Sequence, residues 1–471
     1  MTLRAINSKI NLNYQIFFIL LVFGFFLGLF SGPKIPDELQ TKNCARNINL
    51  PLGLGTSINC DSGTQLRAAM DPSLLFEKDR IVKGRVLTPT SIEFTTPGNA
   101  FVVWILSRPI EYVWKNFIAT NFENFNYLEN SLNKAYELEN IDQNINDSFP
   151  SVSKMIPVYI TFIFYHFLTL LLSFYLFGKI LNINVFNKTE YRNPAIWLGA
   201  LIFINDITKQ FFFSPNSQMF HILAPILTIY FLKILKENDY SYKKLFYFSL
   251  LSGIGMLFYF IFVVPLLIIS LCFLFKNKKK FLYKIPQLIP VGFLFITPFI
   301  FYLILVKSFV PEVDIYFHDV SQNNPGFVIL KKFKEGGVIS LLNSFFYFYS
   351  CLWYKILRHS FIVPLLFIVG LLYFYKKSIN YRIFIEPFAF SIILTVLINL
   401  YSLMECRLLT AVSISFLPGI GYLCKKHIKI ENLRKTQVTF ISILFLYATF
   451  SIVKTSPLGF SNEFSEYTIA K

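Results

Sequence analysis

Charged side chains are scarce in this chain of 471 residues: only 15% are Asp, Glu, Lys or Arg, while 54% are hydrophobic. Soluble globular domains carry about 25% charged residues. The mean hydropathy of +0.53 is correspondingly high. So few charges are not enough to cover a surface that faces water. The composition therefore excludes an ordinary soluble globule and predicts an all-α, polytopic membrane protein.

Acidic residues are the scarcer charges, 27 against 44 Lys and Arg, which gives a net charge of +17. A basic balance raises the question of nucleic-acid binding. Here, however, the basic residues form short clusters between hydrophobic runs, for instance at 276–280, 376–377 and 425–429. Cytoplasmic loops of membrane proteins show this positive-inside pattern. We therefore exclude nucleic acid as a partner and expect membrane lipid instead.

Familiar catalytic signatures are also missing: the sequence has no P-loop, dinucleotide fingerprint, HExxH or GxSxG, and no convincing repeat.

Cys44 and Cys60 lie in the polar region after the first apolar run, where they either form a disulfide or remain two reduced thiols. The triplets 77–79 and 312–314 space two carboxylates as a metal site does, although such triplets also arise by chance. No cofactor is predicted, and a divalent metal is left open.

Apolar runs of about 20 residues mark membrane spans. The first covers 14–30 and follows Arg4 and Lys9, which places the N-terminus in the cytoplasm; a signal peptide is the competing interpretation. We expect about ten spans (nine to twelve) in the inner membrane of a bacterium. The predicted parts are 1–31 (N-terminus and first span), 32–153 (large external mixed loop domain), 154–306 (spans with short or bent helices), 307–359 (second external loop and interfacial aromatic segment), 360–454 (C-terminal spans) and 455–471 (external tail).

The predicted external domain, 32–153, holds 14 of the 27 acidic residues. Within it, 100–118 is apolar but contains Arg108, Glu111 and Lys115. Charges in the middle of a span cost several kcal/mol. We therefore predict an interfacial helix here rather than a span.

Residues 245–275 form a run of 31 without a charge, and both flanks are basic. One helix of this length would measure about 46 Å, well beyond a hydrocarbon core of about 30 Å. Two full spans would need about 40 residues. We therefore predict a pair of short helices, bent near 259–265, with both ends in the cytoplasm. The run 194–204 is also short, only half a membrane thickness.

Charges at the edges of apolar runs are the candidate site residues. Glu405 and Arg407 lie between two apolar runs, where a hairpin would bring them to the outer face; a turn that needs polar residues, or a mutual salt bridge, is the alternative. Asp61 precedes a turn of small residues and is either a helix N-cap or an exposed general base. Asp37 and Glu38 are rivals for the role of base.

Two cations complete the candidates. Arg108 and Lys209 lie near the predicted outer interface, where each either holds a lipid phosphate or extends its charge to the interface by snorkelling. The lone histidines His221 and His318 have no partner at metal-ligand spacing.

The pattern resembles the GT-C superfamily of membrane glycosyltransferases, whose donors are polyprenyl-phosphate sugars. One span leads into a large external loop with an acidic residue, in CDSGTQL at 60–66 or PDEL at 36–39, and short paired spans follow. The Gly-rich run 250–257 is similar to a span common in that family. MECRLLTAVSISFLPGIGYL at 404–423 is similar to its late E-x-R-Y-x-L-P hairpin, with Leu408 in place of Tyr.

The resemblance implies a transferase that moves a sugar from a polyprenyl-phosphate donor to a cell-envelope acceptor. Asp61, or alternatively Asp37 or Glu38, would be the base, and Arg407, held by Glu405, would contact the lipid phosphate. The competing classes are a membrane transporter or flippase, a surface-polysaccharide polymerase or ligase, and a non-catalytic scaffold.

Overall fold

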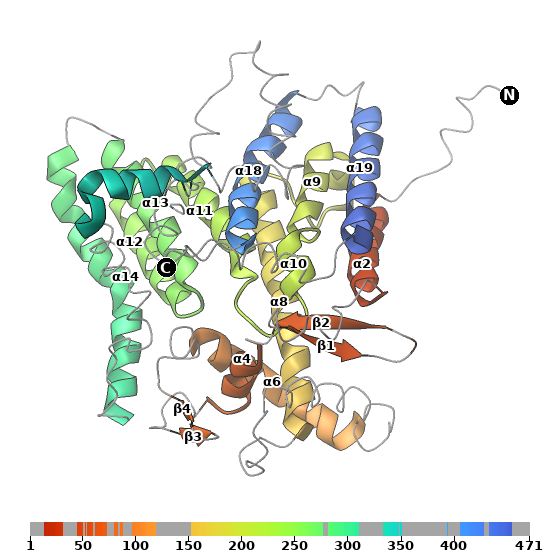
Figure 1. The fold of residues 1–471 in the computed structure, drawn as a ribbon. Coiled ribbons are helices and arrows are strands. Elements are labelled where there is room, and N and C mark those ends of the chain that lie inside the picture. Colours follow the sequence, from red (N-terminus) through yellow and green to blue (C-terminus); the bar gives the residue numbers. More distant parts are fainter. Residues whose placement is uncertain are drawn as a thin grey trace.

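The computed structural model describes residues 14–31, 45–49, 52, 54–59, 62–72, 80–82, 85–87, 97–118, 152–276, 281–309, 333–347, 349–350, 393, 406–427 and 433–454. This part of the chain is mostly helical, which confirms the predicted predominance of helices. Figure 1 shows the longer helices roughly side by side, with two small hairpins and short helices at one end.

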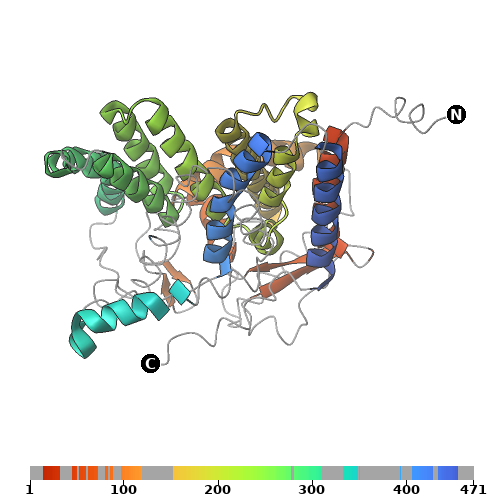
Figure 2. The ribbon, with the colours of Figure 1, turned by 90° about the horizontal axis from the view of Figure 1, so that it is seen from above.

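Long helices make up the bundle. They are α2 (Tyr14–Ser31), α8 (Val152–Leu181), α11 (Phe220–Glu237), α14 (Phe281–Phe309), α18 (Cys406–His427) and α19 (Leu433–Lys454). Helix α8 packs against α11 and α18. Seen from above in Figure 2, α14 lies toward one side of the molecule, and α2 with α19 toward the other.

Shorter elements connect these helices. They are η5 (Lys188–Arg192), α9 (Pro194–Leu198), η6 (Gly199–Ile202), α10 (Asp206–Phe211), α12 (Tyr242–Met256), η7 (Phe260–Phe262) and α13 (Val263–Phe275). Asn193 caps α9, accepting the Ala195 N–H at 3.0 Å, and Pro194 supplies the fixed backbone angle of a first helical turn. The short apolar run predicted at 194–204 is therefore divided between α9 and η6.

Residues 45–118 contain both strands and helices. Strand β1 (Ala45–Asn49) pairs antiparallel with β2 (Gly55–Asn59), and β3 (Arg80–Val82) with β4 (Arg85–Leu87). The helices are α4 (Ser62–Met70), α6 (Pro97–Val113) and the π-helical turn η3 (Trp114–Ile118). The helix expected over 100–118 is therefore present and begins at Pro97.

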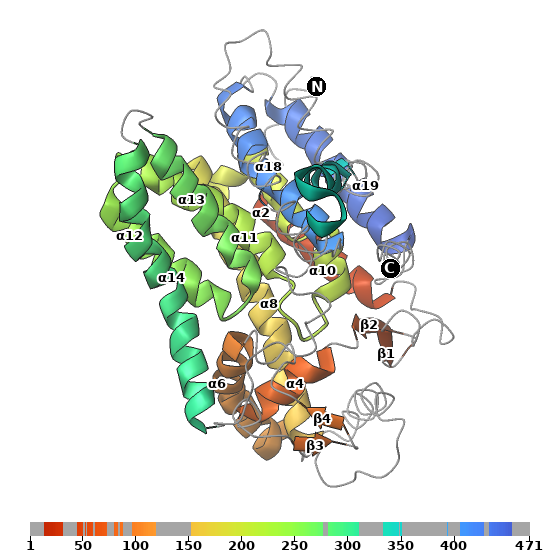
Figure 3. The same ribbon diagram turned by 60° about the vertical axis from the view of Figure 1, so that its left-hand side comes forward.

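The uncharged run 245–275 folds as predicted into two short helices, because α12 ends at Met256 and α13 begins at Val263. Figure 3 shows α12 and α13 running beside α11 and α14. Lys276, just after α13, donates to the carbonyl oxygen of Asp239, just before α12, at 2.9 Å. Both ends of this helical hairpin therefore lie at the same end of the bundle.

Further lysine contacts bring other helix ends to that place. The Lys233 ammonium at the end of α11 donates to Lys179 O of α8 at 2.7 Å, and Lys425 of α18 donates to Leu181 O at 2.8 Å. Lys284 at the start of α14 donates to Phe273 O of α13 at 2.7 Å. We call this gathering of helix ends the basic end. It lies opposite the region 45–118 (Figure 1).

Large apolar side chains cover much of the outer surface. Helix α2 exposes 57% of Phe23, and α14 exposes 68% of Phe293 and 62% of Phe301. Among the described helices, Met155–Leu181 and Tyr283–Phe309 are long and apolar enough to cross a membrane, by length and composition. Tyr14–Phe30, Val263–Phe275, Ala411–Lys425 and Gln437–Thr449 are shorter apolar helices.

The C-terminal half is described in part. Residues 333–347 form a helix that overlaps the start of the aromatic segment expected at the interface. Of the range 360–454, predicted to hold the C-terminal spans, the structure describes position 393 and the helices α18 and α19.

Candidate functional site

Polar side chains are concentrated between η6 and α11, and they are buried. They are Asn205, Thr208, Lys209, Gln210, Ser214, Asn216, Ser217, Gln218 and His221, each less than 10% exposed. Burying polar groups costs free energy unless they find hydrogen-bond partners. We call 205–221 the polar core segment. It is the candidate functional site because an otherwise apolar bundle encloses it.

One asparagine holds the start of α10. The Asn205 amide donates to Leu201 O at 3.1 Å and Ile202 O at 2.8 Å, while its Oδ1 accepts the Thr208 N–H at 3.0 Å. This is an N-cap that uses both halves of the amide. Helix α10 packs against α18 and β2, so the polar core segment lies between the bundle and the region 45–118.

Helix α8 holds the loop that follows α10. His166 has Nδ1 2.8 Å from Phe212 O and Nε2 2.8 Å from Asn216 O, and the Tyr159 hydroxyl donates to Phe213 O at 2.9 Å. A neutral imidazole has one N–H and donates to only one carbonyl, whereas an imidazolium donates to two. A neutral His166 therefore donates one of these two hydrogen bonds.

A second contact joins the polar core segment to the break between α12 and α13. The Tyr259 hydroxyl lies 3.0 Å from His221 Nε2 and donates to Gln218 Oε1 at 3.3 Å. All three side chains are buried. The break in the uncharged run is thus joined to the start of α11 by side-chain hydrogen bonds.

Helix α6 docks on the same break with its first residues. The Gly98 N–H donates to Leu257 O at 2.8 Å, and the Asn99 amide donates to Phe258 O at 2.9 Å. These contacts satisfy carbonyls that a helix leaves open where it ends. A Cβ on Gly98 would lie 3.0 Å from Leu257 O, so only glycine allows this approach without a shift. The Tyr165 hydroxyl of α8 donates to Asn99 Oδ1 at 3.0 Å.

The two cations predicted as phosphate contacts differ in their surroundings. Lys209 is only 3% exposed, so the snorkelling interpretation of this side chain is wrong. Arg108 lies on the surface of α6, donates to Glu111 Oε2 at 3.0 Å and covers the Trp104 ring at 4.7 Å from its centroid. Lys209 therefore belongs to the buried site, while Arg108 belongs to an exposed ion pair.

Most of the other predicted site residues are not among the described residues. Asp37, Glu38, Asp61 and Glu405 lie outside the described residues, as do Cys44, Cys60 and His318. Arg407 lies in the first turn of α18, which begins at Cys406. Helix α4 begins at Ser62, the residue after Asp61. Among the described residues no three metal-ligating side chains gather together.

Sequence reasoning did not single out Asn99, Tyr165, His166 or Tyr259. A signal existed for His166, a histidine within the apolar run of α8. Polar residues inside such runs commonly mark function in membrane proteins. Asn99 gave no such signal, because only the folded chain brings it to Phe258. No protein-family model, no curated protein and no solved structure matches this chain.

Proposed function

We propose that the chain is a multi-pass protein of a bacterial inner membrane with about ten spans. The distribution of polarity supports this placement. Ile289, Phe293 and Phe301 of α14 are 58%, 68% and 62% exposed, while His166, Thr208 and His221 are at most 1% exposed. Exposed apolar area on this scale favours contact with lipid. The polar groups are inside, where backbone carbonyls of Phe212 and Asn216 lie within hydrogen-bond distance of both His166 ring nitrogens.

We propose further that the protein is a glycosyltransferase of GT-C type, which moves a sugar from a polyprenyl-phosphate donor to a cell-envelope acceptor. The observation that carries this proposal is the docking of α6 on the helix break through Gly98 and Asn99. It fastens the region 45–118 directly over short, broken helices and a buried polar segment. Such an arrangement suits a site between a lipid-linked donor and an acceptor outside the membrane.

The proposed chemistry is a displacement at the anomeric carbon. A carboxylate, Asp61 or its rivals Asp37 and Glu38, takes the proton of the acceptor hydroxyl as that oxygen bonds to the anomeric carbon. The bond from this carbon to the phosphate oxygen breaks, and polyprenyl phosphate leaves with the electron pair. Arg407, positioned by Glu405, stabilises the charge on the leaving phosphate.

Proteoliposomes that contain the purified protein and polyprenyl-phosphate sugars test this proposal. Asp61→Asn should lower sugar transfer at least 100-fold, as loss of a general base does. Arg407→Ala should lower it strongly as well. Arg192→Ala is the matched control, because this exposed arginine at the end of η5 belongs to none of the candidate sites, and it should keep most of the activity. Unchanged transfer in both Asp61→Asn and Arg407→Ala would refute the residue assignment.

A transporter or flippase is the second candidate, and a specific observation favours it. Broken helices next to buried polar groups are typical of transporter binding sites. Here the α12–α13 break and the polar core segment meet at Tyr259, His221 and Gln218. Movement of the lipid-linked sugar across the bilayer without formation of a glycoside product would favour this candidate over the transferase.

A further inference from the structure

Three lysines gather where α8 ends at the basic end. The Lys233 ammonium donates to Lys179 O at 2.7 Å, Ile180 O at 3.2 Å and Asn182 Oδ1 at 2.6 Å. The Lys425 ammonium donates to Leu181 O at 2.8 Å and Asn182 O at 3.0 Å. The Lys179 side chain comes from α8 itself. Two ammonium groups therefore cap the last carbonyls of one helix, and a third lies on its last turn.

Among the described groups at the C-terminal end of α8, positive charges outnumber negative ones. Lys179 and Lys425 both repel the charge of Lys233, and the carboxylate of Glu237, 3.8 Å away, attracts it. Glu237 is 58% exposed, and ion pairs so exposed to water are weak. The helix dipole contributes about half a negative charge at the α8 C-terminus. Positive charge therefore remains.

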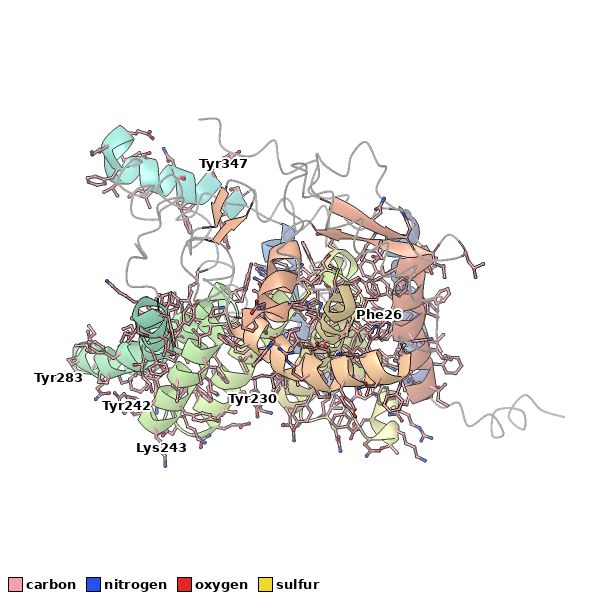
Figure 4. All side chains as sticks on the ribbon, turned by 90° about the horizontal axis from the view of Figure 1, so that it is seen from below. Phe26, Tyr230, Tyr242, Lys243, Tyr283 and Tyr347 are labelled. Carbon is pink, nitrogen blue, oxygen red and sulfur yellow. The ribbon has the colours of Figure 1, made fainter. Side chains whose placement is uncertain are left out.

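Aromatic side chains flank this cluster on the outer surface. The Lys179 ammonium lies 5.3 Å from the centroid of the Tyr175 ring, which contacts the Phe186 ring at 5.9 Å between centroids. Phe186 is 73% exposed. At the same end, Figure 4 shows Tyr242, Lys243 and Tyr283 at the edge of the bundle. Exposed aromatic rings beside lysines are typical of the lipid headgroup level.

We propose that Lys179, Lys233 and Lys425 form a binding site for the phosphate headgroup of an anionic phospholipid. Lys179 and Lys425 supply donors to the phosphate, Lys233 adds charge while its three N–H groups bond Lys179 O, Ile180 O and Asn182 Oδ1, and Tyr175 and Phe186 contact the adjoining glycerol and acyl chain. The site rests on the membrane placement proposed above, but not on the transferase chemistry. It makes the basic end the side of the protein that faces the anionic cytoplasmic leaflet.

Lys179 is the residue to change, because its ammonium caps no backbone carbonyl in the contacts above and its loss leaves the end of α8 intact. Native mass spectrometry of the full-length protein in mild detergent would compare phosphatidylglycerol with phosphatidylcholine of the same acyl chains. Phosphatidylglycerol should bind more tightly. Lys179→Gln should weaken its binding about fivefold, the effect of one lysine near an anionic surface, and Lys179→Arg should restore it.

Two controls make the result specific. Lys307→Gln removes the same charge from the far end of α14 and should leave lipid binding unchanged. Equal binding of the two lipids, no effect of Lys179→Gln, or an equal loss with Lys307→Gln would each overturn the site. Inorganic phosphate at the lipid concentration should not displace phosphatidylglycerol; displacement would show a site for a free anion and overturn the lipid assignment.

Failure of this site and failure of the proposed function are distinguishable. Sugar transfer depends on Asp61 and Arg407, so Lys179→Gln protein that still transfers sugar but binds both lipids equally would refute only the lipid site. Protein that alkaline carbonate extracts from membranes would instead refute the membrane placement, on which both proposals rest.

Discussion

Helices α8 and α14 are both long and apolar, yet they have opposite places in the molecule. In α8, 56% of the most apolar window is buried, against 22% in α14. Helix α8 also carries the buried polar residues Thr161, His166, Thr169 and Ser173, and three of its hydroxyls bond carbonyls of the same helix. The two helices are therefore similar in hydropathy but differ in role. Helix α8 positions buried polar groups, whereas α14 has an exposed apolar surface.

The largest expected effect on stability is that of replacing a buried phenylalanine of α8 with alanine, compared with the same replacement of an exposed phenylalanine of α14. Phe162 of α8 is 0% exposed, so Phe162→Ala should destabilise the fold by about 3–5 kcal/mol through the cavity that it leaves. Phe293→Ala on α14, where the ring is 68% exposed, should cost less than about 0.5 kcal/mol. Thermal unfolding in detergent measures both. Equal losses of unfolding free energy in the two variants would contradict the difference in burial between α8 and α14.

A smaller effect is expected from the imidazole of α8. His166→Leu leaves Phe212 O and Asn216 O without this partner, and an unsatisfied buried acceptor costs about 1–3 kcal/mol. The unfolding midpoint should fall, and amide hydrogen exchange in 212–219 should rise more than exchange in α14. An exchange pattern identical to that of the wild type would show that His166 does not hold this loop.

The contact of α14 with the bundle should be sensitive to a single methyl group. A Cβ on Gly253 of α12 would lie 2.2 Å from Phe295 O, so Gly253→Ala must push the two helices apart, at about 1–3 kcal/mol. Gly292→Ala, on α14 itself, is the matched control, because nothing described lies within 4 Å of its Cβ. The control should be neutral or slightly stabilising. Similar unfolding midpoints for the two variants would argue against this packing.

Much of the helical framework was predictable from the sequence because length and charge restrict it. The 31 uncharged residues between basic flanks fit neither one span nor two, and the α12–α13 hairpin is the arrangement that satisfies both constraints. The helix at 100–118 was predictable because its internal charges made a span costly. These are arguments about single segments, which need no knowledge of their neighbours.

The candidate site was less predictable, because it depends on neighbours. Lys209 was interpreted as a cation near the outer interface that either holds a lipid phosphate or snorkels, whereas α18 and β2 pack against α10 and Lys209 is buried. Nor does periodicity tell which face of an all-apolar helix is covered: α2 buries Phe25 but exposes Phe23. The roles of Asp37, Glu38, Asp61, Glu405 and Arg407 stay predictions.

Fluorescence quenching by brominated lipids tests the central claim, an apolar exterior around a polar interior, most directly. Phe293→Trp places a reporter on the exposed face of α14, whereas the native Trp197 is fully buried. In proteoliposomes, brominated acyl chains should quench most of the fluorescence that Phe293→Trp adds, and little of that lost with Trp197→Phe. Equal quenching of the two, or no quenching at position 293, would contradict a membrane-embedded bundle with its polar groups inside.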